Sequence, residues 1–223
     1  MVGKWFLPVI HVLNEEQMLR NLTISKNAGA DGVFLINHGI LTFRELLRLH
    51  SRAVLEFPDW WIGVNCLDLS GVDVFQFLDN SVSGVWVDNG GIDGKKNIQA
   101  KKILFSKENS SWNGLYFGGV SFKYQNNIPD DFLASSIAMG FMDIITTSGP
   151  ATGKKASVEK ISIMKHALGS TRLALASGVT CDNVIECLPF VDIFLVATGI
   201  SDSFYELNPV KVSSLSNIIH TYE

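Results

Sequence analysis

The sequence has little charge and no long apolar run. Charged residues make up only 18% of the 223 residues, and the basic ones are dispersed along the chain. No basic cluster therefore predicts nucleic-acid binding, and no segment reaches the roughly 18 to 20 uncharged apolar residues of a membrane-spanning helix. Pro8 and His11 interrupt the N-terminal apolar segment, which also lacks a signal-peptide cleavage site. We expect a cytoplasmic chain without a membrane span and without nucleic acid as a partner.

Cysteine is scarce, and motifs for common cofactors are missing. Cys66, Cys181 and Cys187 have neither metal-ligand spacing nor a histidine pattern nearby, so they are interpreted as reduced thiols. No G-x-G-x-x-G turn follows the first apolar run, and Lys154 and Lys155 are not followed by Ser or Thr as a Walker loop requires. The sequence therefore predicts no metal site and no cofactor.

Apolar residues are abundant, at 47%, and they recur in short runs. Segments with helical spacing lie between most of the runs, and Asn14 and the pair Thr42 and Glu45 are typical of helix starts. This alternation predicts one α/β domain over residues 1–223, a (β/α)₈ TIM barrel. A doubly wound open sheet fits the same pattern but lacks the glycine-rich turn. The expected strands lie within 5–12, 32–37, 60–67, 84–89, 114–122, 142–149, 172–178 and 192–199.

Polar side chains follow each of these apolar runs. In a barrel the active site is built from the carboxyl ends of the strands and the loops after them, so polar residues at all eight ends favour a ligand site. We expect an acid, a base, an electrophile and a positioning donor among these residues. A core histidine, a helix-capping aspartate and a lysine that reaches the surface are the structural alternatives for three of them. The catalytic candidates are Asp88, His11, His38, Asn65 and Lys123.

Two adjacent runs end in almost the same way, as "LALASGVT" and "IFLVATGIS". The loops after the seventh and eighth strands of a barrel frequently bind phosphate, and glycine lets backbone N–H groups approach the anion. We call these two loops the clamp and expect Gly199→Glu to abolish phosphate binding without disturbing the fold. Two ordinary turns, with Thr180 as a helix N-cap, are the alternative. The clamp candidates are Ser177, Gly178, Thr180, Thr198, Gly199 and Ser201.

The segment "TTSGPATGKKAS", residues 146–157, is rich in hydroxyl donors and ends near a lysine pair. It is expected to form an anion-binding wall beside the clamp. Together with the second strand end it supplies the substrate-binding candidates, which are Asn37, Ser148, Gly149, Thr152 and Gly153.

The C-terminal half resembles the BtpA/SgcQ family, which has a strand ending in S-G-x-x-T-G and another ending in S-G-V-T-x-x-N-V. The chain carries "SGPATG" and "SGVTCDNV" at these places, and "DGVFLINHG" and "WWIGVNCLD" are similar to the second and third strand ends of the family. The resemblance implies a ribulose-phosphate-binding type barrel of a phosphoribosyltransferase-like family, linked in phototrophs to photosystem I biogenesis. The chain departs from the family at His38, where a Glu is expected.

Two functions follow as hypotheses. The first is an enzyme that acts on a phosphorylated sugar or nucleotide-like molecule by glycosyl or phosphoribosyl transfer, isomerisation or lyase chemistry. The second is a non-catalytic barrel that binds such a metabolite and serves as an assembly or regulatory factor, as the resemblance to the BtpA family implies. The sequence leaves open whether the chain forms a homo-oligomer.

Overall fold

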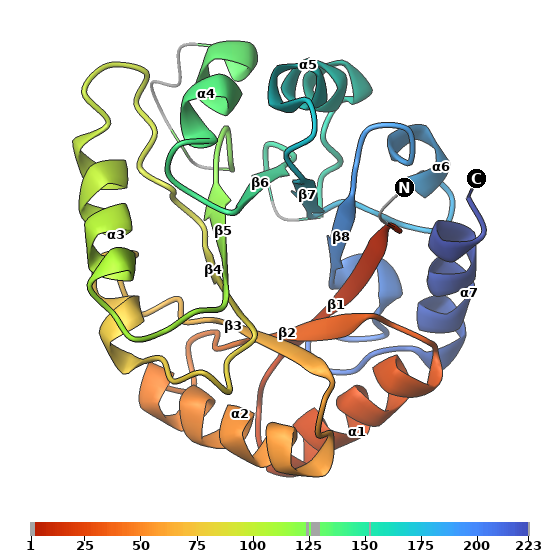
Figure 1. The fold of residues 1–223 in the computed structure, drawn as a ribbon. Coiled ribbons are helices and arrows are strands. Elements are labelled where there is room, and N and C mark those ends of the chain that lie inside the picture. Colours follow the sequence, from red (N-terminus) through yellow and green to blue (C-terminus); the bar gives the residue numbers. More distant parts are fainter. Residues whose placement is uncertain (1–2, 124, 126–129, 152, 223) are drawn as a thin grey trace.

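The computed structural model describes residues 3–123, 125, 130–151 and 153–222, and its eight strands close into a parallel barrel in the order β1 to β8 (Figure 1). The predicted barrel is confirmed, and the open sheet is excluded because β1 pairs with β8. The strands are β1 (Trp5–His11), β2 (Gly32–Ile36), β3 (Trp61–Asn65), β4 (Gly84–Val87), β5 (Leu115–Gly119), β6 (Ile144–Ser148), β7 (Leu173–Ala176) and β8 (Ile193–Val196).

Helices surround the barrel in Figure 1. Asn14 and Thr42 cap the first two helices as predicted, and Thr42 forms a complete capping box with Glu45. The chain departs from strict alternation after β3, where only a 3₁₀ turn, η1 (Val74–Phe77), follows. The other helices are α1 (Glu15–Asn27), α2 (Phe43–Glu56), α3 (Ile98–Glu108), α4 (Asp131–Ala138), α5 (Val158–Leu168), α6 (Val184–Cys187), η2 (Thr198–Ile200) and α7 (Pro209–His220).

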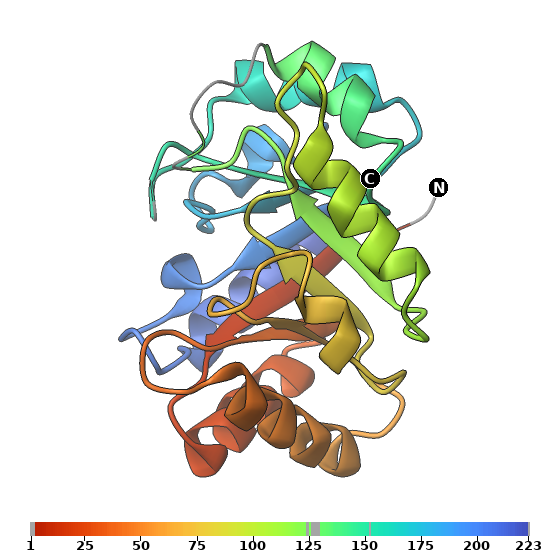
Figure 2. The same ribbon diagram turned by 90° about the vertical axis from the view of Figure 1, so that its left-hand side faces the viewer.

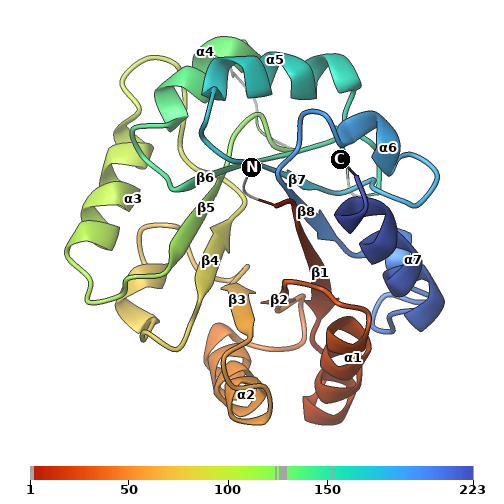
Figure 3. The same cartoon turned by 45° about the vertical axis from the view of Figure 1, so that its right-hand side comes forward.

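The last helix closes the helical layer beside the first. Figure 3 shows α7 next to α1, and α7 also contacts β1. Lys4 lies 5.5 Å from the centre of the Tyr222 ring, so the two ends of the described chain meet at the amino end of the barrel. In Figure 2 the segment after β8 projects on the opposite side, where the strands end. None of the helices in the described residues has the length and apolar composition needed to span a lipid bilayer.

Alternation along the strands divides the apolar residues into two cores. Phe6 and Ile10 of β1 belong to the core between barrel and helices, whereas Leu7 and Val9 belong to a second core inside the barrel. Aromatic rings fill much of this interior. The centre of the Phe34 ring lies 5.1 Å from the ring centres of both Trp61 and Phe117.

Gly63 on β3 provides a test of this packing. A Cβ there would lie 2.6 Å from Cε1 of Phe34 and 2.7 Å from Cη2 of Trp61, so Gly63→Ala should overpack the interior and lower the free energy of unfolding by about 1–3 kcal/mol. Urea denaturation measures the change through the midpoint.

Gly140→Ala is the matched control, because its Cβ would meet no atom closer than the Ile137 oxygen at 3.7 Å. Its unfolding free energy should change by less than about 1 kcal/mol. Equal effects of the two substitutions would contradict the packed interior.

Candidate functional site

A cavity of about 310 Å³ opens at the carboxyl ends of the strands, and we call it the mouth cavity. Its floor includes inward-facing residues of the interior core, among them Val9, Trp86 and Ala176. Candidates from all three predicted groups line it, so most of the catalytic and clamp candidates face one space together with one substrate-binding candidate, Gly153. The lining candidates are His11, His38, Asp88, Lys123, Gly153, Ser177, Gly178, Thr198 and Gly199.

Strand alternation explains where His11, Asp88 and Asn37 lie. His11 continues the inward series of Leu7 and Val9, and Asp88 stands two residues after inward-facing Trp86. Asn37 has the opposite phase and lies outside the cavity lining. Its amide donates to the Leu41 carbonyl and to Asp68, and its oxygen accepts from the backbone of Leu67. Asn37 therefore braces two loops.

Asp88 is the central carboxyl group of the site. Its Oδ1 accepts a hydrogen bond from Nδ2 of Asn65 at 3.0 Å. Burial raises the pKa of Asp88, while the bond from Asn65 and the positive charge of Lys123 act in the opposite direction. A carboxyl group with a raised pKa is suited to exchanging a proton with a bound substrate. Asn65 does not line the mouth cavity. Its contact with the site is through Asp88.

His11 is held in a neutral form. Its Nδ1 lies 3.1 Å from the carbonyl oxygen of Phe204, and the two rings stack with centres 4.1 Å apart. Burial, followed by the charge of His38, lowers the pKa of His11 to about 4. Because a carbonyl oxygen only accepts, Nδ1 carries the proton and Nε2 is left as an acceptor. His38 completes the cluster, with its ring centre 5.9 Å from that of His11.

The clamp loop after β7 lies against the backbone of the segment that follows β6. Gly178 has a φ of +72°, and a Cβ there would lie within 2.5 Å of the Lys154 backbone. Asn183 secures the loop by donating to the Gly178 carbonyl at 2.8 Å and accepting from the Thr180 amide at 2.9 Å. Within the described residues no oxygen accepts from the backbone N–H of Gly178 or Val179. These donors are available to an anion.

The structure differs from several of the expectations for the clamp residues. A Cβ on Gly199 would collide with the Val179 carbonyl, so the expected tolerance of Gly199→Glu is wrong. Thr180 is not a helix N-cap, since Asn183 occupies that position of α6. Ser201 donates to the Ala197 carbonyl at 2.9 Å and lies outside the mouth cavity. Thr180 also lies outside it.

The segment after β6 contributes less to the cavity than predicted. Ser148 is buried, donates to Gly149 and accepts from the backbone of Lys123 at 2.8 Å. A Cβ on Gly149 would collide with the Lys154 carbonyl, so this glycine permits a close backbone approach. Gly153 lines the cavity, and Thr152 lies outside the described residues.

Two residues at the site have no signal in the sequence. Phe204 lies in the loop after β8 yet stacks on a histidine of β1. Gln125 donates to the carbonyls of Asp88 and Gly119, both at 3.1 Å, and so fixes the backbone that carries the Asp88 carboxyl group. Phe204 reaches His11 because β8 pairs with β1, and Gln125 reaches Asp88 because β4 pairs with β5. Both are loop residues, and no periodicity marks them.

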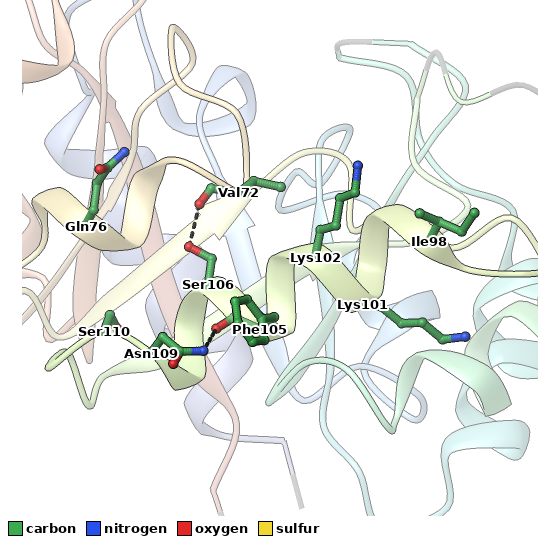
Figure 4. A pocket seen from close by; sticks show the side chains of 9 residues that line it. All are labelled: Val72, Gln76, Ile98, Lys101, Lys102, Phe105, Ser106, Asn109 and Ser110. Carbon is green, nitrogen blue, oxygen red and sulfur yellow. Dashed lines mark hydrogen bonds between the residues drawn. The ribbon is translucent and has the colours of Figure 1, made fainter.

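A larger cavity, of about 700 Å³, lies away from the strand ends, on the outer surface between α3 and the segment around η1 (Figure 4). We call it the outer groove. Ser106 donates to the Val72 carbonyl and Asn109 to the Phe105 carbonyl, so these side chains already have partners. No catalytic or clamp candidate lines this groove. Size alone therefore does not identify the functional site.

Two curated relatives match most of the chain. An uncharacterized protein of Thermococcus kodakarensis is 25% identical over 92% of this chain and 84% of its own length. An uncharacterized protein of Methanocaldococcus jannaschii is 24% identical over 87% of this chain and 80% of its own length. No protein-family profile matches the chain.

Solved structures with a similar fold include three enzymes. The (S)-3-O-geranylgeranylglyceryl phosphate synthase of Thermoplasma acidophilum, in complex with sn-glycerol-1-phosphate, has a TM-score of 0.66 at 14% identity and covers 99% of this chain and 95% of its own. The phosphoribosyl anthranilate isomerase of Thermus thermophilus has a TM-score of 0.65 at 12% identity, and the match covers 95% of this chain and 96% of that structure. The thiamine phosphate pyrophosphorylase of Pyrococcus furiosus has a TM-score of 0.63 at 15% identity, and the match covers 97% of this chain and 95% of that structure. These similarities support the TIM-barrel fold.

The lowered pKa of His11 predicts a loss of stability in acid. Between the ordinary pKa of 6.5 and the folded value of about 4, the unfolded chain binds a proton that the folded chain does not. Stability therefore falls as the pH drops through this window, by at most about 3 kcal/mol. The partial exposure of the ring reduces this figure.

His11→Gln removes the titrating group and keeps a donor near the Phe204 carbonyl. The difference in unfolding free energy between wild type and variant should shift against the wild type as the pH falls from 7 to 4. Urea denaturation at each pH measures it. A difference that stays constant with pH would contradict a neutral, desolvated His11.

Proposed function

We propose that the chain is an enzyme that binds a phosphorylated sugar or nucleotide-like molecule in the mouth cavity. One observation carries the proposal: Asp88, His11 and Lys123 line the same cavity as the clamp residues Ser177 and Gly178. The backbone N–H groups of Gly178 and Val179, which donate to no oxygen of the described residues, suit a phosphate group. Solved structures with this fold, one of them in complex with sn-glycerol-1-phosphate, make such a ligand reasonable.

In the proposed reaction the phosphate group binds the clamp but does not itself react. Binding it at the clamp places the sugar between the two sides of the mouth cavity and contributes orientation. Asp88 exchanges a proton with the substrate, which its raised pKa favours. Neutral His11 accepts a hydrogen bond from a sugar hydroxyl, and Lys123 donates to developing negative charge. Transferases, isomerases and lyases all use such proton transfers.

The resemblance to the BtpA/SgcQ family gives the second hypothesis, a metabolite-binding assembly or regulatory factor. That function needs the clamp but not the proton-transferring groups. Burial raises the pKa of Asp88, Asn65 donates to its carboxyl group, and Gln125 donates to its backbone carbonyl. A buried carboxyl group held in place at the mouth cavity favours the enzyme. Membership of the BtpA/SgcQ family itself stays a prediction.

Ser177 offers a test of phosphate binding. Its φ is +77°, a conformation that Asn and Asp adopt more readily than other non-glycine residues. Ser177→Asp places a carboxylate at the clamp, and Ser177→Asn is a neutral control of nearly equal size. We expect ribose 5-phosphate, but not ribose, to stabilise the wild type by roughly 2.7 kcal/mol at a hundredfold excess over Kd.

The control should keep most of this stabilisation and Ser177→Asp should lose it, as measured by the shift in melting temperature. Phosphate binding at the clamp is disproved by either of two results. One is no shift with any member of a panel of sugar phosphates and mononucleotides. The other is equal shifts for the two variants.

Asp88→Asn separates catalysis from binding. Asparagine keeps an oxygen that accepts from Asn65, but it cannot exchange a proton as a carboxyl group does. Turnover of whichever panel compound the wild type consumes should fall by about 10²- to 10⁴-fold, with the ligand-induced melting shift retained. A wild type that binds a panel compound tightly and converts none would favour the non-catalytic hypothesis.

A further inference from the structure

A second cavity, of about 300 Å³, opens beside the mouth cavity between the loops after β3 and β4, and we call it the side cavity. Leu67, Trp86 and Asp88 line both cavities. We propose that the side cavity binds an uncharged, planar, hydrogen-bonding ring of the ligand whose phosphate lies at the clamp. This inference rests on the proposed function and gives the substrate class: a phosphorylated sugar that carries a nucleobase-like ring.

The walls of the side cavity carry no cation. Among the described residues that line it, the titratable side chains are Asp88, at the junction, and Cys66. Burial, together with the charge of Asp68, raises the pKa of the Cys66 thiol to about 12, so the thiol is neutral. An anionic group would find no counter-charge among the described residues that line this cavity, whereas the clamp across the barrel presents the backbone N–H groups of Gly178 and Val179, for which the described part of the chain supplies no acceptor. The ligand is thus oriented with its phosphate away from the side cavity.

Amide side chains supply the polar contacts. Asn65 is only 2% exposed, and its Nδ2 donates a hydrogen bond to Asp88. Its Oδ1 has no hydrogen-bond partner in the described part of the chain. Gln99, at the start of α3, likewise makes no side-chain hydrogen bond to any described residue. An amide presents a donor and an acceptor side by side, a pattern that the edge of a nucleobase matches in one plane.

Apolar side chains supply the faces for such a ring. Leu69, Val74 and Val87 line the side cavity together with the Trp86 indole. Planar rings gain most from surfaces of this kind, since both faces are apolar and only the edge needs hydrogen bonds. Each of the two cavities is near the lower limit of ligand pockets, roughly 300–1,000 Å³. Occupying both would suit a molecule of mononucleotide size.

The test compares ribose 5-phosphate, the four common ribonucleoside 5′-monophosphates and the corresponding nucleosides by calorimetry. At least one mononucleotide should bind at least ten times more tightly than ribose 5-phosphate. Gln99→Trp should fill the side cavity and remove this gain while leaving ribose 5-phosphate unaffected. Lys102→Trp is the matched control, because it adds the same ring to the exposed surface of α3, outside the side cavity.

A measurement on the wild type avoids any dependence on the variants. Under near-ultraviolet light 4-thiouridine 5′-monophosphate should crosslink to peptides that contain residues 65–71 or 99, rather than to the clamp.

Three results would overturn the inference and leave the proposed function intact. One is that ribose 5-phosphate binds and no mononucleotide binds more tightly; another is that the tighter binding of a mononucleotide persists in Gln99→Trp. The third is that crosslinks are confined to the clamp. Suppose instead that nucleosides bind, that Gln99→Trp abolishes their binding, and that a 5′-phosphate does not change their affinity. This result would support ring binding in the side cavity and contradict phosphate binding at the clamp. Binding by no compound would overturn both.

Discussion

The closed parallel barrel imposes one constraint on which the rest of the structure depends. Successive side chains on each strand point alternately into the barrel and out toward the helices. The inward series of β1 and β4 therefore end at the same mouth, on His11 and Asp88. Asn37 lies one residue away from the inward series of β2, and its side chain binds the backbone of two loops instead of lining the mouth cavity.

The interior is filled unevenly, and this shapes the cavity above it. Strands β2 to β5 contribute Phe34, Trp61, Trp86 and Phe117, whose rings pack edge to face. Strand β7 contributes only Ala174 and Ala176. Small side chains below the clamp keep space open there, while Trp86 forms a wall shared by the mouth and side cavities. The packing that stabilises the barrel thus also supplies the wall that the two cavities share.

The sequence was sufficient to predict the barrel and its strand ends, because short apolar runs and the turns after them are local signals. It failed where the outcome depends on strand phase or on distant loops. The sequence predicts that Asn37 contacts the substrate, but counting by twos from Phe34 places its side chain outward. It also predicts that Gly199 is open to a ligand, but the missing Cβ of Gly199 makes room for the Val179 carbonyl. Phe204 and Gln125 reach the site through loop conformations that no periodicity describes.

Desolvation sets the electrostatics of the site. Burial is the largest influence on both His11 and Asp88, and it moves each toward its neutral form, lowering one pKa and raising the other. Lys123 lowers both values through its positive charge, so it promotes a neutral His11 and partly restores the charged form of Asp88. Under the proposed function, a phosphate at the clamp would meet the neutral imidazole of His11, the positive charge of Lys123 and the backbone donors of the clamp. Asp88 lines both the mouth cavity and the side cavity, so in that proposal it would exchange a proton away from the phosphate.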